Sequence, residues 1–535
     1  MPSLKFLLER RSLYILIIFA VVLGGVFRLS NLSGKVYWHD ETYTALYATG
    51  HDNSEAVNAM FDGQVKTAAD VLRFQTVTPG RGLGATVRQL ADNDAQHPPL
   101  YYLATRLLMY GIRDPIWATR LVAAIAGILV IPAVYWLSLE LFNSSVTASV
   151  TMALVAVSPF QYLYAQEARE YSFWTLSIVL ASTALLKALR KNSLLSWLTY
   201  AAVLTVSLYA CILMFLVMAS HSVYVVWQTF MGQTLNWQPR HSKVLRNFAL
   251  SVGASLLLFV PWLQFIAKSG VNAVSWTAEP MPMMALVKIW AGNLSRLFFD
   301  LNLDTTDPLF YSIPPVLLAL GLISYTLIWA IRYLPKSALI FLALLGGITL
   351  LTFVGPDLVV GGRRSSVSRY LIPTYLSLQL MVAYLLAQKL SARRARLFWR
   401  GTLVSVIMVG LISCAVSLPA DTWWHKKNSH LNPEVVRVIN RASNSLLISS
   451  PYHANLGELF SLCHLLDPGQ KLLLFQENDL PTIPDGFDKI FVFNISKQAR
   501  NQFAQTTNYE VTPAYEAGRL WQLKAVDGGI EQSVS

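Results

Sequence analysis

Two adjacent carboxylates, Asp40 and Glu41, follow the first apolar segment of the chain and are framed by tyrosine and tryptophan side chains. The repulsion between neighbouring carboxylates favours one of them as a general base near neutral pH. A base beside a membrane exit can take a proton from a hydroxyl group while an amphiphilic donor stays in the lipid. Solvated acidic side chains on a loop are the alternative interpretation.

His97 precedes two prolines and the sequence Leu-Tyr-Tyr, which ends at Tyr102. The double proline predicts the start of a helix. The positive end of that helix favours a neutral imidazole, which can hydrogen-bond a substrate. A helix cap without a role in binding is equally consistent with this segment.

Gln166, Glu167 and Arg169 lie in a short connection between two apolar segments, just before Tyr171. The alternation of the segments places this connection on the same side of the membrane as Asp40. Its charges are not explained by the bias of basic residues toward the cytoplasm. Structural ion pairing at a helix turn is the alternative.

Three arginines, Arg363, Arg364 and Arg369, fall within seven residues and are followed by Tyr370. The planar guanidinium suits phosphate because it makes paired, charge-assisted hydrogen bonds. Anionic lipid head groups are the alternative ligand. We favour a specific phosphate, since the other loops assigned to this side of the membrane have no such cluster.

These side chains belong to a very apolar chain. It has 535 residues, of which 54% are hydrophobic and 13% charged, and its mean hydropathy is +0.44. Stretches of about twenty apolar residues can cross about 30 Å of hydrocarbon. The sequence predicts such spans at 13–29, 117–139, 146–164, 171–189, 194–209, 211–230, 247–266, 309–331, 337–354, 371–388 and 401–418. With the short segment 98–112 as a partial or interfacial helix, we expect a polytopic α-helical membrane protein with about 11 to 13 transmembrane helices.

The formal net charge of +12 would suit nucleic-acid binding, but the basic residues collect in alternate loops, at 5–11, 187–191, 240–246, 332–336 and 389–400. This distribution is typical of the cytoplasmic loops of a multi-pass protein. It predicts a plasma (inner) membrane protein with a cytoplasmic N-terminus and, after an odd number of spans, an extracytoplasmic C-terminus. We expect contacts with membrane lipids and no nucleic-acid partner.

The chain changes character after residue 420. Short β-like runs at 445–450, 471–476, 489–494 and 520–525 alternate with helical patterns near 453–466 and 496–506. This alternation predicts a small α/β domain. We therefore expect a membrane domain, 1–420, whose outer loop 30–97 carries the acidic pair, and an extracytoplasmic domain, 421–535.

The acids, the histidine and the arginine cluster together suit a sugar linked to a lipid phosphate. Phosphate is a good leaving group once it is paired with cations, so the reaction needs only a base for the acceptor hydroxyl. A polytopic transporter or lipid flippase is the alternative from another class. Transporters show paired repeats and broken helices near the bilayer midplane, whereas the polar motifs here cluster at the outer face.

In their order along residues 1 to about 420, the four motifs resemble those of the GT-C membrane glycosyltransferases. The closest likeness is to the protein O-mannosyltransferase-like and aminoarabinose-transferase-like branch. The resemblance implies the GT-C fold, a polyprenyl-phosphate-linked sugar donor, and an extracytoplasmic active site that serves the cell envelope. The acceptor it implies is a lipid, a glycan or a protein.

The resemblance also implies roles for residues. The catalytic acids would be Asp40 as base, Glu41 in support and Glu167 as the second acidic position. The donor phosphate would be bound by Arg169, Arg363, Arg364 and Arg369. Substrate contacts would come from His97, Tyr102, Gln166, Tyr171 and Tyr370. A single displacement with Asp40 as base would invert the sugar carbon. Relatives differ over a divalent metal ion, so no cofactor is assigned.

Overall fold

The computed structural model describes residues 4–231, 239–269, 272–302, 309–391, 395–426, 428–453, 455–477, 479–506, 509–515 and 518–525. The chain divides into two compact units. The first comprises residues 1–32, 90–105 and 119–419, and the second comprises residues 33–89, 106–118 and 420–535.

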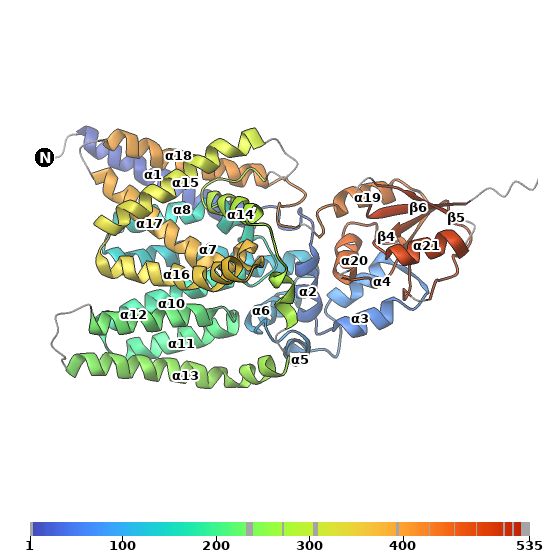
Figure 1. Ribbon diagram of the computed structural model, residues 1–535, viewed down its shortest axis with the longest axis horizontal. Helices are drawn as coiled ribbons and strands as arrows, with labels where there is room; N and C mark the ends of the chain where they lie inside the picture. Colours follow the sequence, from blue (N-terminus) through green and yellow to red (C-terminus); the bar gives the residue numbers. More distant parts are fainter. Residues whose placement is uncertain are drawn as a thin grey trace, which may run out of the picture. The chain divides into compact units, whose positions relative to one another are not determined.

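Every apolar segment that we predicted to span the membrane is helical (Figure 1). The helices are α1 (Leu4–Leu29), α7 (Pro115–Phe142), α8 (Ser145–Ala156) with α9 (Pro159–Ala165), α10 (Tyr171–Lys191), α11 (Leu194–Ala210), α12 (Met214–Phe230), α13 (Pro239–Ser269), α15 (Leu309–Tyr333), α16 (Lys336–Val359), α17 (Ile372–Ser391) and α18 (Arg396–Ser417). Among the described residues, eight of these helices are long and apolar enough to cross a membrane alone. The pair α8 and α9 is bent by 60°, and α11 and α12 are shorter apolar helices.

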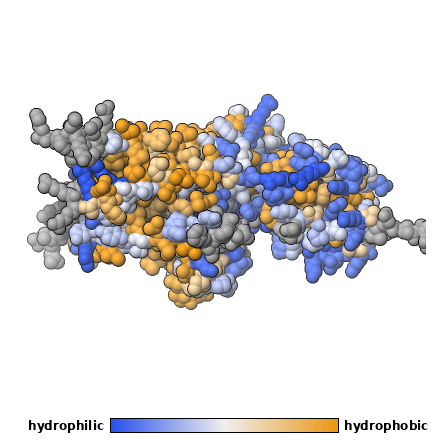
Figure 2. All heavy atoms as spheres, turned by 90° about the horizontal axis from the view of Figure 1, so that it is seen from above, coloured by the Kyte–Doolittle hydropathy of each residue, from blue (hydrophilic) through white to orange (hydrophobic). Residues whose placement is uncertain are grey.

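The outer surface of these helices is apolar. Leu257, Leu318 and Leu351 are 72, 76 and 71% exposed, and Figure 2 shows a broad hydrophobic surface over the helical part of the molecule. A protein surrounded by water rarely exposes an apolar surface of this extent. We conclude that the helices face lipid and that the chain is a multi-pass membrane protein.

Two side chains fix the break between α8 and α9. Arg28, which is buried near the end of α1, donates hydrogen bonds to the carbonyls of Val155 and Ala156 at distances of 3.0 and 2.6 Å. These carbonyls lie at the end of α8, where helix carbonyls lack intrahelical partners. Gln166, just after α9, donates in return to the carbonyls of Phe27 and Ser30 at the end of α1. Together, the hydrogen bonds of Arg28 and Gln166 fix the position of the segment that follows α9.

The second unit contains a six-stranded mixed sheet with the strand order β1-β3-β2-β4-β6-β5. The strands are β1 (Val65–Thr67), β2 (Ser445–Ser449), β3 (Lys471–Leu474), β4 (Lys489–Phe493), β5 (Tyr509–Pro513) and β6 (Leu520–Ala525). Strands β3, β2 and β4 are parallel, whereas β1 and the β5–β6 hairpin are antiparallel to their neighbours. All residues of β2 are buried, as expected for a central parallel strand covered on both faces.

Helices complete the second unit (Figure 1). They are α2 (His39–Ala48), α3 (Asn53–Met60), α4 (Ala68–Leu72) and the first part of α5 (Leu83–Asn93) from the outer loop, and α19 (Asn432–Asn440), α20 (Asn455–Cys463) and α21 (Lys497–Thr506) from the tail. Ala499 and Phe503 of α21 join the apolar core of the sheet. The segment 98–112 forms α6 (Leu100–Met109), which at about 1.5 Å per residue is too short to cross a membrane.

The α/β alternation predicted for the tail is confirmed, since each predicted strand and both predicted helices are present. The prediction missed β5, α19 and the short strand β1. Strand β1 lies in the outer loop, and residues 33–89, which the sequence interpretation grouped with the membrane domain, pack with residues 420–535 in the same unit.

Candidate active site

The predicted site residues fall in both units. Asp40 and Glu41 belong to the second unit, and the other predicted residues belong to the first.

The acidic pair opens helix α2, and its two carboxylates differ in environment. Glu41 is fully buried, and its Oε2 lies 2.8 Å from Nζ of Lys426, which is also fully buried. The same oxygen accepts the backbone N–H of Trp38 at 3.2 Å, as the acidic residue of a capping box does. Asp40 is only half-buried. Asp40 is therefore partly accessible to water, while Glu41 is fully buried and bound to a cation from the tail.

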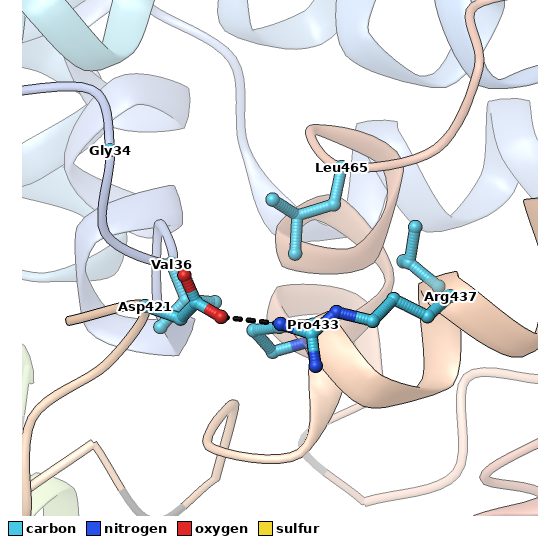
Figure 3. Close-up of a pocket in the computed structure, with 7 residues that line it drawn as sticks. Gly34, Val36, Asp421, Pro433, Arg437 and Leu465 are labelled. Carbon is cyan, nitrogen blue, oxygen red and sulfur yellow. Dashed lines mark hydrogen bonds and ion pairs between the residues drawn. The ribbon is translucent and has the colours of Figure 1, made fainter. Parts of the chain in front are cut away.

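A small pocket of about 180 Å³ lies beside the segment that leads into α2. Figure 3 shows Asp421 and Arg437 facing each other across it, with Val36 and Leu465 in its lining. The ion pair is half exposed, and such pairs contribute little to stability. The two charged side chains of this pocket are paired with each other.

In the first unit, His97 and the connection after α9 form one hydrogen-bonded network. Nδ1 of His97 lies 2.7 Å from Oε1 of Glu170, and Nε2 lies 3.0 Å from Nη2 of Arg169. Arg169 also donates to the Tyr102 hydroxyl at 3.4 Å. Only 17% of the His97 side chain and 4% of the Glu170 side chain are exposed. His97, Tyr102 and Arg169 were predicted from the sequence, and Glu170 was not.

The charges of the network determine its protonation. Burial alone would raise the pKa of the Glu170 carboxyl, but the positive charges of His97 and Arg169 outweigh it and hold this pKa at about 2. Burial lowers the pKa of His97, whereas Glu170 and Asp94 raise it, and the net change is upward. In the neutral ring Nδ1–H donates to Glu170, so that Nε2 can accept from Arg169. Protonation of His97 removes that acceptor.

Glu167 and Gln166 are buried in the same connection. The Gln166 amide donates to two backbone carbonyls of α1, so the side chain predicted to bind substrate has a structural contact. Glu167 acts electrostatically on the Tyr164 hydroxyl, as Arg369 does. Tyr164 is in turn hydrogen-bonded to Ser368 at 2.8 Å. These contacts bring the connection after α9 and the arginine segment together.

The three clustered arginines differ in their partners. Nη2 of Arg363 lies 2.6 Å from the Glu279 carboxylate, and the guanidinium lies over the Trp276 ring. Arg364 lies 3.1 Å from the buried carboxylate of Asp357. That carboxylate also accepts the backbone N–H and the hydroxyl of Ser365, each at 2.7 Å. Arg364 thus helps to fold its own loop.

Arg369 lies among aromatic side chains. Its guanidinium is 5.3 Å from the ring centroid of Tyr171 and 5.8 Å from that of Tyr370. Tyr171 also experiences the charges of Glu170 and Arg169. Arg369 therefore lies beside Tyr171, while the carboxylate partners of Arg363 and Arg364 are Glu279 and Asp357.

Comparisons with known proteins bear on the fold. The family described as dolichyl-phosphate-mannose-protein mannosyltransferase matches residues 96–265, which include His97, Glu167, Arg169 and Glu170. The crystal structure of ArnT from Cupriavidus metallidurans bound to undecaprenyl phosphate is 12% identical, with a TM-score of 0.52, and the match covers 96% of this chain and 97% of ArnT. ArnT in the apo state is also 12% identical, with a TM-score of 0.53 and coverage of 97% and 98%. No curated protein matches the sequence.

The chain has the GT-C fold. The fold predicted from the four motifs is therefore confirmed, over nearly the whole chain. Because the match to ArnT covers 96% of the chain, it extends into the tail, which the sequence resemblance did not include.

Whether the protein has a metal site depends on its side chains. Within the described ranges, no group of three or more His, Cys, Asp and Glu side chains is arranged to hold a metal ion. The carboxylates of Glu41 and Glu170 are bonded to a lysine and to a histidine. Among the described residues, these side chains therefore assign no metal site.

Sequence reasoning missed three residues that shape the site: Arg28, Glu170 and Lys426. Glu170 stands next to Arg169, and a second acid so close to a membrane span was a usable signal. Arg28 sits within the first apolar segment and carried a similar signal. Lys426 gave none, because it lies 385 positions from its partner Glu41 in a stretch that reads as an interfacial belt.

Proposed function

We propose that this GT-C protein transfers a sugar from a polyprenyl-phosphate-linked donor to an acceptor outside the cytoplasm. The observation that carries the proposal is the likeness to ArnT along nearly the whole chain. It is supported by the buried network of charged residues, His97, Arg169 and Glu170, inside the segment that matches the mannosyltransferase family. ArnT was crystallised with undecaprenyl phosphate, so we take a polyprenyl phosphate as the carrier.

Asp40 is the proposed general base. Its carboxylate accepts the proton of the acceptor hydroxyl or amine as the acceptor attacks the anomeric carbon. The new bond to that carbon forms while the bond from the same carbon to the phosphate oxygen breaks, and polyprenyl phosphate leaves with the electron pair. A single displacement inverts the configuration of the sugar carbon. For Glu41, which is fully buried and bound to Lys426, we propose a supporting role.

Arg369 and Arg169 are the proposed contacts of the departing phosphate. The Arg369 guanidinium lies 5.3 Å from the centre of the Tyr171 ring, and the charge of Arg169 also acts on Tyr171. A pair of cations held in place stabilises the negative charge that develops on the phosphate. Arg363 and Arg364 were assigned the same role from the sequence. Each is within 3.1 Å of a carboxylate, so we propose instead that Arg364 fixes its own loop and that Arg363 ties this loop to Glu279.

We place the active site on the extracytoplasmic face of the plasma (inner) membrane, with the N-terminus in the cytoplasm. The support is the alternation of basic loops in the sequence, which follows the positive-inside rule. Cysteine residues introduced at position 62 and at position 485 of the second unit should react with a membrane-impermeant maleimide in intact cells. Labelling only after the cells are opened would contradict this topology.

One experiment tests the function directly. Membrane lipids and glycans are compared by mass spectrometry between cells with and without the protein. We expect a glycan to lose one sugar and the corresponding polyprenyl-phosphate sugar to accumulate when the protein is removed. Unchanged glycans together with the loss of a transported solute would favour a transporter instead.

A further inference from the structure

We propose that Lys426 of the tail is a positioning residue for Asp40, which acts by holding the neighbouring Glu41 as a buried carboxylate. This inference rests on the proposed function, in which Asp40 is the base. It assigns a role to the tail that neither the motifs nor the family match provides, since the family match ends at residue 265.

The ion pair is the first support. Nζ of Lys426 lies 2.8 Å from Oε2 of Glu41 and 3.1 Å from the carbonyl oxygen of Val36. Neither side chain of the pair is exposed. The Lys426 ammonium also lies 5.3 Å from the centre of the Trp423 ring. Lys426 thus binds both the segment before α2 and the first turn of α2. Asp40 lies in that turn, immediately before Glu41.

A second set of contacts reaches the same helix turn. The backbone N–H of His39 donates to the Ser429 hydroxyl at 3.0 Å, and that hydroxyl donates to Glu458 at 3.0 Å. Arg519, just before β6, lies 3.1 Å from the other oxygen of Glu458. The residues on both sides of Asp40 are therefore bound by the tail, His39 through Ser429 and Glu41 through Lys426.

The other side of the turn is held as well. The Gln75 amide donates to the carbonyl of Thr42 at 2.7 Å, and its oxygen lies 2.6 Å from Nε2 of His464. Strand β1 continues this attachment, because it pairs with β3 of the tail. Residues 39, 41 and 42 have tail partners, directly or through one side chain, so the direction of α2 depends on the tail.

The burial of the pair explains why its loss should affect catalysis. Removing one partner of a buried ion pair leaves an uncompensated charge, whereas replacing both partners with neutral groups is often tolerated. An unpaired Glu41 would turn toward water and move the helix turn. A displacement of about 1 Å at a catalytic group can lower the rate by about a hundredfold.

The test compares variants of the full-length protein in membranes. The probes are sugar transfer, measured as the glycan product that disappears when the protein is removed, and binding of undecaprenyl phosphate to the purified protein. For Lys426→Met we expect transfer to fall by about a hundredfold, with the affinity for undecaprenyl phosphate within about twofold of wild type. Lys426→Arg, which keeps the charge, should retain most of the transfer. Lys489→Met, at an exposed lysine of the same unit, is the control and should behave as wild type.

Transfer by Lys426→Met at the wild-type rate would overturn the inference, and so would an equal loss of lipid affinity. If Lys426→Met does not accumulate, the double variant Glu41→Gln with Lys426→Met decides. A folded double variant with impaired transfer supports a positioning role, whereas a double variant that transfers normally or does not fold contradicts it.

Asp40→Asn in the same assay separates the two levels of the proposal. An active Asp40→Asn variant would remove the assignment of the base itself. An inactive Asp40→Asn beside a fully active Lys426→Met would leave the proposed function intact and remove only the role of the lysine.

Discussion

Arg28 caps the C-terminal end of α8, and Gln166 caps the C-terminal end of α1. Arg28 of α1 donates to the last carbonyls of α8, and Gln166 after α9 donates to the last carbonyls of α1. These hydrogen bonds fix the bend between α8 and α9. Glu167, Arg169 and Glu170 lie directly after α9. The position of the charged network in the first unit therefore depends on an arginine in the first transmembrane helix.

Replacing Arg28 should destabilise the protein. Arg28→Met leaves the carbonyls of Val155 and Ala156 buried without their donor, and hydrogen bonds to charged groups contribute about 1.5–3 kcal/mol each. We expect a clear drop in the thermal unfolding temperature in detergent. Arg190→Met is the control, because Arg190 is 60% exposed and forms a surface pair with Glu140, and its removal should cost less than about 1 kcal/mol. Equal melting temperatures for the two variants would contradict the capping role.

The stability that Glu170 provides should depend on pH in the acid range. The pKa of Glu170 is lowered from 4.5 to about 2 in the folded protein, because His97 and Arg169 outweigh the effect of burial. A lowered carboxyl pKa stabilises the fold above the unfolded pKa, and this contribution is lost as the pH falls toward the folded value. The difference in melting temperature between wild type and Glu170→Gln should therefore be largest above about pH 5 and shrink below pH 4.5. A difference that stays constant down to pH 3 would show that the carboxylate charge does not contribute.

Arg369 and Arg364 should separate binding from stability. Arg369→Ala removes a proposed phosphate contact, and we expect at least tenfold weaker binding of undecaprenyl phosphate, or about 1.4 kcal/mol, at an unchanged melting temperature. Arg364→Ala breaks the contact with the buried Asp357 and should lower the melting temperature with a smaller change in binding. Isothermal titration and thermal unfolding of both variants provide the comparison. The reverse pattern would return the phosphate role to Arg364.

Gly457 tests how closely the tail approaches the acidic helix. A Cβ at this position would lie 2.3 Å from Nδ1 of His39, the residue before Asp40. Alanine in a helix is usually favourable by about 1 kcal/mol over glycine, but here the overlap should reverse the sign and cost about 1–3 kcal/mol. Gly84→Ala, in helix α5, is the control, since no atom lies within 4 Å of its Cβ. If Gly457→Ala is as stable and as active as the control, His39 does not pack where the structure places it.

Local signals predicted much of this fold. Apolar length identified the spans, and short apolar, β-like runs identified the central strands of the tail, because both patterns are read within a single segment. Strand β1 has only three residues, which is too few for any periodicity. Its place in the sheet depends on β3, whose residue Leu473 pairs with Val65.

The site was predicted less completely for the same reason. His97, Arg169 and Arg369 stood out as charged or titratable side chains near span ends. Their mutual arrangement was not predictable, and neither was the burial of Glu41, because it depends on Lys426 at the far end of the chain. A sequence shows that a carboxylate is present, but its partner is determined by tertiary packing.

The most direct measurement is sugar transfer by purified Asp40→Asn protein, reconstituted with the polyprenyl-phosphate sugar that accumulates in cells lacking the protein. The asparagine is nearly isosteric but cannot accept the acceptor proton. We predict a loss of transfer of at least about a hundredfold, with an unchanged melting temperature and unchanged binding of undecaprenyl phosphate. Transfer at the wild-type rate by this variant would contradict the assignment of Asp40 as the base.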